Sequence, residues 1–234
     1  PALLAAIANY STQKIVVAPQ SGIRKLDELR GKIVGVTQYG SEGDTFLRIA
    51  LKSANLRPDV DVTIFQTGGG ANTVQALAAG KIHAGATGGA NALQAKRFGA
   101  SEIASGEEMK ILAPAGTLAT TRRKIARDRQ EVMNFMRAFV EGIHFFKTNR
   151  EASIRVMQKF LGGLPLEIIN PLYNETRDRM PGLPMPMKEA IQAVLDRETD
   201  PRAKSLQPAD VADLSFLQEI EKSGFFGELY KTSK

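Results

Sequence analysis

The sequence predicts an α/β protein whose first half carries a largely parallel β-sheet and whose second half is helical. The first supporting observation is the alternation of strand and helix patterns in the first half. Strands are expected at residues 15–17, 33–36, 60–65, 82–86, 109–112 and 117–120, and helices at 26–29, 46–54, 73–79 and 90–98. Such alternation is typical of β-α-β units, whose strands run parallel.

The second observation is the helical periodicity of the second half. Apolar residues recur every three or four positions from Val132 to Phe146, which predicts a long amphipathic helix. Further helices are expected at residues 152–160, 166–176, 188–196 and 208–220. Residues 180–186 contain three prolines and predict a stiff connector, because proline has no backbone N–H to donate inside a helix.

Composition indicates a globular protein and excludes several kinds of site. Of the 234 residues, 43% are hydrophobic and 24% are charged. The chain has no cysteine, so it offers no disulfide, zinc–thiolate site or cysteine nucleophile. Its histidines, His83 and His144, lack metal-ligand spacing, and we expect no metal or cofactor. The net charge of +6 is scattered and tryptophan is absent, so we expect no nucleic-acid partner.

The candidate site consists of three loops, each lying between an expected strand and an expected helix. The candidate ligand-binding residues are Gln38, Tyr39, Gly40, Ser41 and Gly43 in the first loop, Thr67, Gly68 and Gly69 in the second, and Thr87, Gly88 and Gly89 in the third. Ligands of open parallel sheets bind beyond the carboxyl ends of the strands, where helix N-termini offer unpaired N–H groups. We therefore expect a small polar ligand with at most one or two negative charges.

A purely structural interpretation of these loops stays open. Glycines can serve only to let a strand turn into a helix, and Ser41 with Asp44 forms a capping box that needs no ligand. No P-loop is present, because Ser41-Glu42 follows Gly40 where Lys-Ser/Thr would be required. The loops therefore favour a small ligand held by backbone and hydroxyl groups over a nucleotide.

Six segments of the sequence together match the pattern of a known family: residues 21–23, 26–36, 40–41, 75–81, 139–151 and 213–217. Through them the chain resembles the substrate-binding proteins of ABC importers, in the branch that binds nitrate, sulfonates, taurine and thiamin precursors (the SsuA/THI5-like, NMT1 family). The resemblance covers nearly the whole chain. It implies a type II periplasmic-binding-protein fold, in which two α/β lobes are joined by crossover strands near residues 15–18 and 115–120 and grip the ligand between them.

The resemblance also implies a domain plan. Residues 1–18 would be a remnant of lobe 1 with the first crossover, residues 19–114 would be lobe 2 with the ligand loops, and residues 115–234 would return to lobe 1. Residues 1–9 are expected to be a late helix of lobe 1, most of which is missing from the sequence.

The function implied by the resemblance is capture of a small ligand, such as a sulfonate, nitrate, carboxylate or pyrimidine-like molecule, and its delivery to an ABC permease in the membrane. The protein would be monomeric, not an enzyme, and periplasmic or tethered outside the cell, with no signal peptide in this sequence. One alternative is a cysteine-free enzyme of the same fold acting on a small organic acid or heterocycle; related enzymes rely on cysteines. Another is a sensory module, which would need a partner domain.

Overall fold

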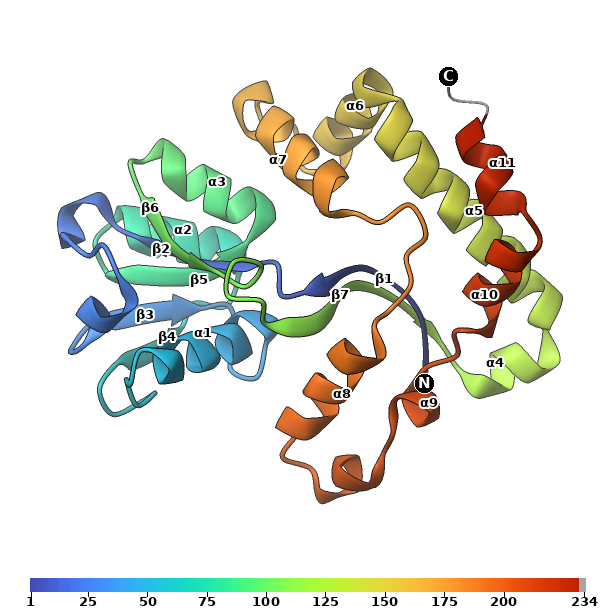
Figure 1. Ribbon diagram of the computed structural model, residues 1–234. Coiled ribbons are helices and arrows are strands. Elements are labelled where there is room, and N and C mark those ends of the chain that lie inside the picture. The colour runs from blue at the N-terminus through green and yellow to red at the C-terminus, as the bar shows by residue number, and fades with distance from the viewer. Residues whose placement is uncertain (232–234) are drawn as a thin grey trace. The chain divides into compact units, whose positions relative to one another are not determined.

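The computed structural model describes residues 1–231 and contains two compact units (Figure 1). Unit 2 is Ser11–Ile111, and unit 1 combines Pro1–Tyr10 with the chain from Leu112 onward. The chain therefore passes between units after Tyr10 and after Ile111. These positions differ from the crossovers expected at residues 15–18 and 115–120, which instead lie largely within strands of unit 2 and unit 1 respectively.

Unit 2 is built on a five-stranded sheet with the strand order β4-β3-β5-β2-β6. The strands are β2 (Gln13–Val17), β3 (Ile33–Val36), β4 (Thr63–Gln66), β5 (Ala84–Gly88) and β6 (Ser101–Ser105). β3 is parallel to β4 and β5, and β2 is antiparallel to both β5 and β6. The expected largely parallel sheet is confirmed, with β2 as the exception, because β2 enters directly from the other unit and not through a helical crossover.

Helices cover both faces of this sheet (Figure 1). They are α1 (Glu42–Ser53), α2 (Gly70–Ala78) and α3 (Gly89–Arg97), accompanied by the short 3₁₀ helices η1 (Pro19–Ser21) and η2 (Leu26–Leu29). Phe46 and Leu47 of α1 pack with Ile15 on one face, and Val74 of α2 packs with Val16 on the other. The alternating residues of β2 thus point to opposite cores, as strand geometry requires.

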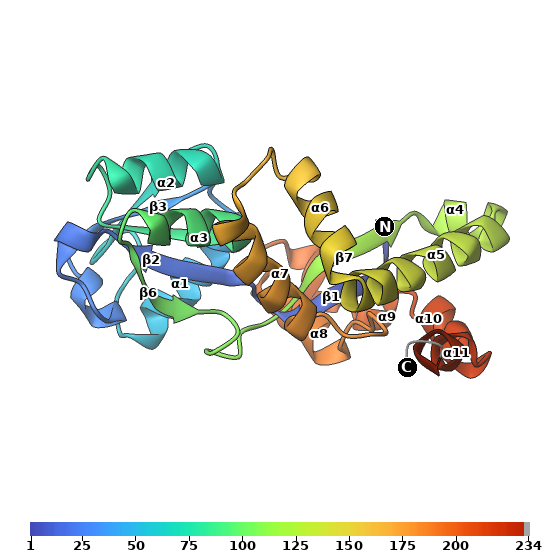
Figure 2. The same ribbon diagram turned by 90° about the horizontal axis from the view of Figure 1, so that it is seen from above.

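Unit 1 pairs a two-stranded antiparallel sheet with helices. β1 (Ala2–Tyr10) pairs with β7 (Leu112–Thr120). The helices are α4 (Arg122–Arg127), α5 (Arg129–Thr148), α6 (Arg150–Phe160), α7 (Leu166–Arg179), α8 (Lys188–Arg197), η3 (Pro201–Ser205), α9 (Pro208–Val211), α10 (Ser215–Lys222) and α11 (Phe225–Lys231). Figure 2 shows α10 and α11 beside the long α5, where Met136 and Phe216 share a buried cluster.

Several expected elements were wrong. Residues 1–9 were expected to be helical, but Ala2–Tyr10 form strand β1, and the strand is buried over most of its length, so its alanine-rich sequence carries no period-two signal. Residues 109–110 belong to a turn, and β7 begins only at Leu112. The helix expected at 208–220 is interrupted between α9 and α10. Within residues 1–231, no helix combines the length and apolarity needed to cross a membrane.

Candidate functional site

The three predicted loop regions meet at one edge of the unit 2 sheet. Because β3 is parallel to both β4 and β5, their carboxyl ends lie at the same edge. From there the chain enters α1, α2 and α3, so three helix N-termini lie along this edge. Seven of the eleven predicted residues lie between a strand and a helix, whereas Gly43 lies in α1, Thr87 and Gly88 end β5, and Gly89 begins α3. The expected third loop is therefore absent, because β5 runs directly into α3. The role of all eleven in binding a ligand stays a prediction.

The first loop is held together by its own side chains. The Ser41 hydroxyl accepts a hydrogen bond from the Asp44 backbone N–H at 3.3 Å, and an Asp44 carboxylate oxygen accepts one from the Gly40 N–H at 2.8 Å. Asp44 is buried and also pairs with Arg48, whose Nε lies 2.9 Å from its carboxylate. Ser41 therefore caps α1 as expected, but the return bond of a capping box is not made, because Asp44 accepts from the Gly40 N–H while the Ser41 N–H donates to the Gln38 carbonyl. Both side chains are accounted for without a ligand.

Tyr39 is tied to the neighbouring strand. Its backbone N–H donates to the Gln66 side-chain oxygen at 3.0 Å, and its hydroxyl donates to the Ile64 carbonyl at 3.0 Å. The side chain is nevertheless about half exposed. The ring can thus contact a ligand, while the hydroxyl already has a partner. Gln38 beside it is exposed.

The two predicted threonines face inward. The Thr67 hydroxyl lies 2.7 Å from that of Thr73 and 3.0 Å from the Val36 carbonyl, so it fixes the second loop to the end of β3. Thr87 is 2% exposed and pairs with Lys14 across the sheet. These positions explain how the loops are held, and they leave the neighbouring glycine backbone as the accessible part.

The starts of α2 and α3 differ from the start of α1. Among residues 1–231, no side chain caps the N-terminus of α2 or of α3, whereas Ser41 caps α1. The backbone N–H groups in the first turns of α2 and α3 are therefore available to an anion, and the helix dipoles favour negative charge there. Glycines at both starts allow close approach of a ligand to the backbone.

Asn91, in the first turn of α3, contacts the start of α2. A Cβ atom on Gly70 would clash with the Asn91 Nδ2 atom, so the Asn91 amide rests directly on the first residue of α2. Neither Gly70 nor Asn91 was among the predicted residues. A signal was present, because the tripeptide Gly-Ala-Asn begins both helices, at residues 70–72 and 89–91.

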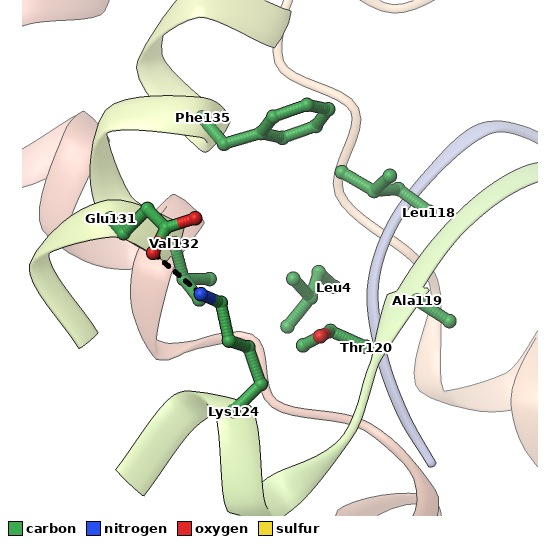
Figure 3. A pocket seen from close by; sticks show the side chains of 8 residues that line it. All are labelled: Leu4, Leu118, Ala119, Thr120, Lys124, Glu131, Val132 and Phe135. Atoms are coloured by element: carbon green, nitrogen blue, oxygen red, sulfur yellow. Dashed lines mark hydrogen bonds and ion pairs between the residues drawn. The ribbon is translucent and has the colours of Figure 1, made fainter. Parts of the chain in front are cut away.

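Unit 1 contains a concave surface of a different kind (Figure 3). A cavity of about 220 Å³ is lined by Leu4, Leu118, Ala119, Thr120, Lys124, Glu131, Val132 and Phe135. Its walls are mainly apolar, and Lys124 is paired with Glu131 and Asp128. None of the predicted residues lines it. Within the described part of the chain, no three His, Cys, Asp or Glu residues are grouped to hold a metal ion.

The sequence matches the family model described as NMT1/THI5 like over residues 2–153, which is more than half of the chain. The chain belongs to the NMT1/THI5-like family. This membership confirms the resemblance carried by the sequence motifs. No curated protein matches the sequence.

Solved structures with the same fold add detail to the family assignment. The alkanesulfonate-binding protein SsuA from Xanthomonas axonopodis pv. citri, bound to MOPS, is 22% identical with a TM-score of 0.66, and the match covers 82% of this chain and 66% of that one. The periplasmic sulfonate-binding protein SsuA from Methylobacillus flagellatus KT is 17% identical with a TM-score of 0.72, covering 96% and 71%. The desulfurization enzyme DSZB is 14% identical with a TM-score of 0.67, covering 95% and 79%.

These likenesses establish the fold of this NMT1/THI5-like protein. It is the α/β fold of type II periplasmic binding proteins, as expected from the sequence. The chain spans slightly less than two thirds of the length of the Xanthomonas protein. Both binding proteins and an enzyme share this fold, so the fold alone does not choose between the two classes.

Proposed function

We propose that this protein is a solute-binding protein whose unit 2 holds the anionic group of a small ligand at the starts of α2 and α3. The observation that carries the proposal is the pair of uncapped helix N-termini joined by the contact of Asn91 with Gly70. Their backbone N–H groups and dipoles favour a single compact anion. Tyr39, on the first loop, would add a ring face for the ligand's apolar part.

The proposed ligand class is an organic sulfonate. A sulfonate has one negative charge spread over three acceptor oxygens, which suits several N–H donors from two helix starts. The structural likeness to alkanesulfonate-binding SsuA supports this choice. Nitrate, carboxylates and pyrimidine-like heterocycles are the competitors to be tested beside it.

Delivery to a partner completes the proposed role. We propose that the loaded protein acts outside the cytoplasm as a monomer and passes its ligand to an ABC permease in the membrane. The support is family membership and the likeness to periplasmic sulfonate-binding proteins. The alternative is an enzyme acting on a small organic acid or heterocycle, which the likeness to DSZB supports. Mass spectrometry of the small molecules would detect turnover of a bound sulfonate or sulfinate. Such turnover would favour the enzyme.

The direct test is isothermal titration with ethanesulfonate, MOPS, nitrate, acetate and a pyrimidine, using the wild type and Gly70→Ala. The added methyl group would displace the Asn91 amide and crowd the start of α2, so we expect Kd for the sulfonates to rise by about tenfold or more. Alanine is a better helix former than glycine, so Gly70→Ala should not lose stability through the helix itself.

The matched control is Gly142→Ala in α5, where an added Cβ meets no atom within 4 Å. It should leave both the fold and the Kd unchanged. Binding of a sulfonate that is equally tight in Gly70→Ala and in the wild type would contradict the proposed site. Preference for the heterocycle over every anion would contradict the ligand class.

A further inference from the structure

The carboxylate of Glu42 connects the first ligand loop to the segment by which the chain enters unit 2. Glu42 is the first residue of α1, between the capping Ser41 and the buried Gly43. Its Oε1 atom accepts from the Ser11 hydroxyl at 3.0 Å and lies 3.4 Å from the Thr12 backbone nitrogen. Its Oε2 atom lies 3.3 Å from Nε2 of Gln13. One side chain of the loop therefore binds three consecutive residues of the entering segment.

The entering segment is in turn bonded to the segment by which the chain leaves unit 2. The backbone N–H of Ser11, the first residue of the unit, donates to the carbonyl of Ile111, the last residue, at 2.9 Å. The Gly106 N–H donates to the Gln13 carbonyl at 2.9 Å. A Cβ on Gly106 would clash with the Ser11 carbonyl oxygen, so the two backbones touch. A displacement of one connecting segment must move the other.

The Gln13 side chain extends the connection to the junction of β5 and α3. A Cβ on Gly43 would lie 3.4 Å from Oε1 of Gln13, and a Cβ on Gly88 would lie 3.2 Å from its Nε2. The Gln13 amide thus occupies the space between the start of α1 and the end of β5. Glu42 holds this amide in place through the contact with Nε2.

We propose that Glu42 is a positioning residue that couples the ligand loops to the two segments linking the units. It acts through Ser11 and Gln13, and the Glu42 carboxylate itself does not bind ligand, because its oxygens are engaged by the entering segment. A ligand that shifts the first loop or the junction of β5 and α3 therefore shifts the backbone at Gly106 and Ile111. The role of Glu42 in the response to ligand rests on the proposed function. The coupling of the first loop to the two linking segments does not depend on it.

The first experiment measures hydrogen exchange of single backbone amides in the ligand-free protein, for the wild type, Glu42→Ala and Glu42→Gln. Gly106 and Ile111 make no contact with Glu42 in the network above, so faster exchange there reports coupling and not the loss of a direct bond. We expect these two amides to exchange about threefold faster or more in Glu42→Ala. Glu42→Gln keeps one acceptor oxygen and should restore part of the protection.

The matched control is Glu28→Ala, which removes another exposed carboxylate of unit 2, one that accepts from the Arg24 N–H at 2.7 Å. It should leave Gly106 and Ile111 unchanged. In addition, the single substitution Ser11→Ala should speed hydrogen exchange of the Gly40 amide. The same substitution should cause no further acceleration at Gly40 when Glu42→Ala is already present. Acceleration confined to Thr12, or equal effects of Glu28→Ala and Glu42→Ala, would overturn the coupling.

The second experiment adds ethanesulfonate. In the wild type we expect slower exchange at Gly106 and Ile111 as well as at Gly70 and Gly89, and in Glu42→Ala we expect the slowing only at the two helix starts. Slowing at Gly106 in Glu42→Ala as large as in the wild type would overturn the proposal. If ethanesulfonate slows no amide of the wild type, the proposed function fails, and the ligand-free experiment still decides the coupling.

Discussion

The two units of the molecule bury their apolar residues in different ways. Unit 2 has one five-stranded sheet with a buried cluster on each face, so its strands and all three of its α-helices share two continuous cores. Unit 1 has a two-stranded sheet, and its buried residues form separate clusters around α5 and α10, α6 and α7, and α8. A binding edge made of several loops needs fixed strand ends, and unit 2 provides them.

This difference explains why the candidate site is placed in unit 2. Each of its loops starts from a strand whose register is fixed by neighbours and ends in a helix packed on the sheet. Two concave surfaces of unit 1 lie between β7 and α4–α5 and have mainly apolar walls. A third, of about 550 Å³, lies at the starts of α8, α9 and α10 and has polar lining that includes Arg122 and Lys188, but no strand end contributes to it. The contrast predicts that damage to a core will spread widely in unit 2 and remain local in unit 1.

The largest expected effect is that of Phe46→Ala. Phe46 is 1% exposed in the core between α1 and the sheet, and its truncation should lower the free energy of unfolding by about 3–5 kcal/mol. Hydrogen exchange should accelerate throughout unit 2, including the strand-to-helix junctions of the site, because all of them depend on that core. Phe160→Ala is the control: Phe160 is 78% exposed, and its loss should cost about 0.5 kcal/mol or less. Acceleration confined to α1 would show that the core of unit 2 does not respond as one cooperative unit.

A smaller effect is expected from removing one hydroxyl in each unit. The Tyr173 hydroxyl donates to the Phe146 carbonyl at 2.9 Å from a fully buried side chain, and the Tyr39 hydroxyl donates to the Ile64 carbonyl at 3.0 Å from a half-exposed one. Tyr173→Phe should lower the free energy of unfolding by about 1–2 kcal/mol, since water does not replace the bond, and Tyr39→Phe by about 0.5 kcal/mol. Urea denaturation of both variants measures the difference. Equal losses of unfolding free energy in the two variants would show that burial does not determine how much each hydroxyl contributes to stability.

The smallest effect concerns a surface carboxylate of unit 2. Hydrogen bonds from the Arg57 side chain and backbone N–H hold the pKa of Asp61 well below its ordinary value. Because the folded pKa is lowered, the stabilisation is present above the unfolded carboxyl pKa of about 3.9 and is lost as the pH falls through the folded value. Asp61→Asn should therefore lower Tm slightly at pH 7 and by progressively less in acid. A Tm difference that is independent of pH between 7 and 2 would contradict this.

Several elements could be read from the sequence because their local chemistry agrees with the fold. The β-branched segment of β3, the glycine loops and the periodic apolar face of α5 all predict the elements that form. β1 was missed because burial over most of its length removes the alternation that marks a strand, and β6 was missed because Ser101–Ser105 contains only one β-branched residue. Within the site, the first two loops are predictable from the sequence, and the third is not, because β5 extends to Gly88 and meets α3 directly.

The direction of the site side chains was not predictable from spacing alone. Thr67 and Thr87 belong to the loops in sequence, yet packing turns the first toward Thr73 and buries the second in the sheet. The sequence does not indicate the role of Asn91, because its proximity to Gly70 depends on how α2 and α3 pack side by side. Such tertiary contacts decide which polar groups remain free for a ligand, and a single sequence does not contain them in readable form.

Binding of one anionic group at the starts of α2 and α3 can be followed by titrating the isotope-labelled protein with ethanesulfonate and recording the backbone amide resonances of its glycines. We expect saturable shifts of Gly69, Gly70, Gly88 and Gly89, with the unit 1 glycines Gly142, Gly162 and Gly163 unmoved. Saturable shifts at unit 1 glycines with the helix-start glycines unmoved, or no shift of any glycine up to millimolar ligand, would contradict the proposed site.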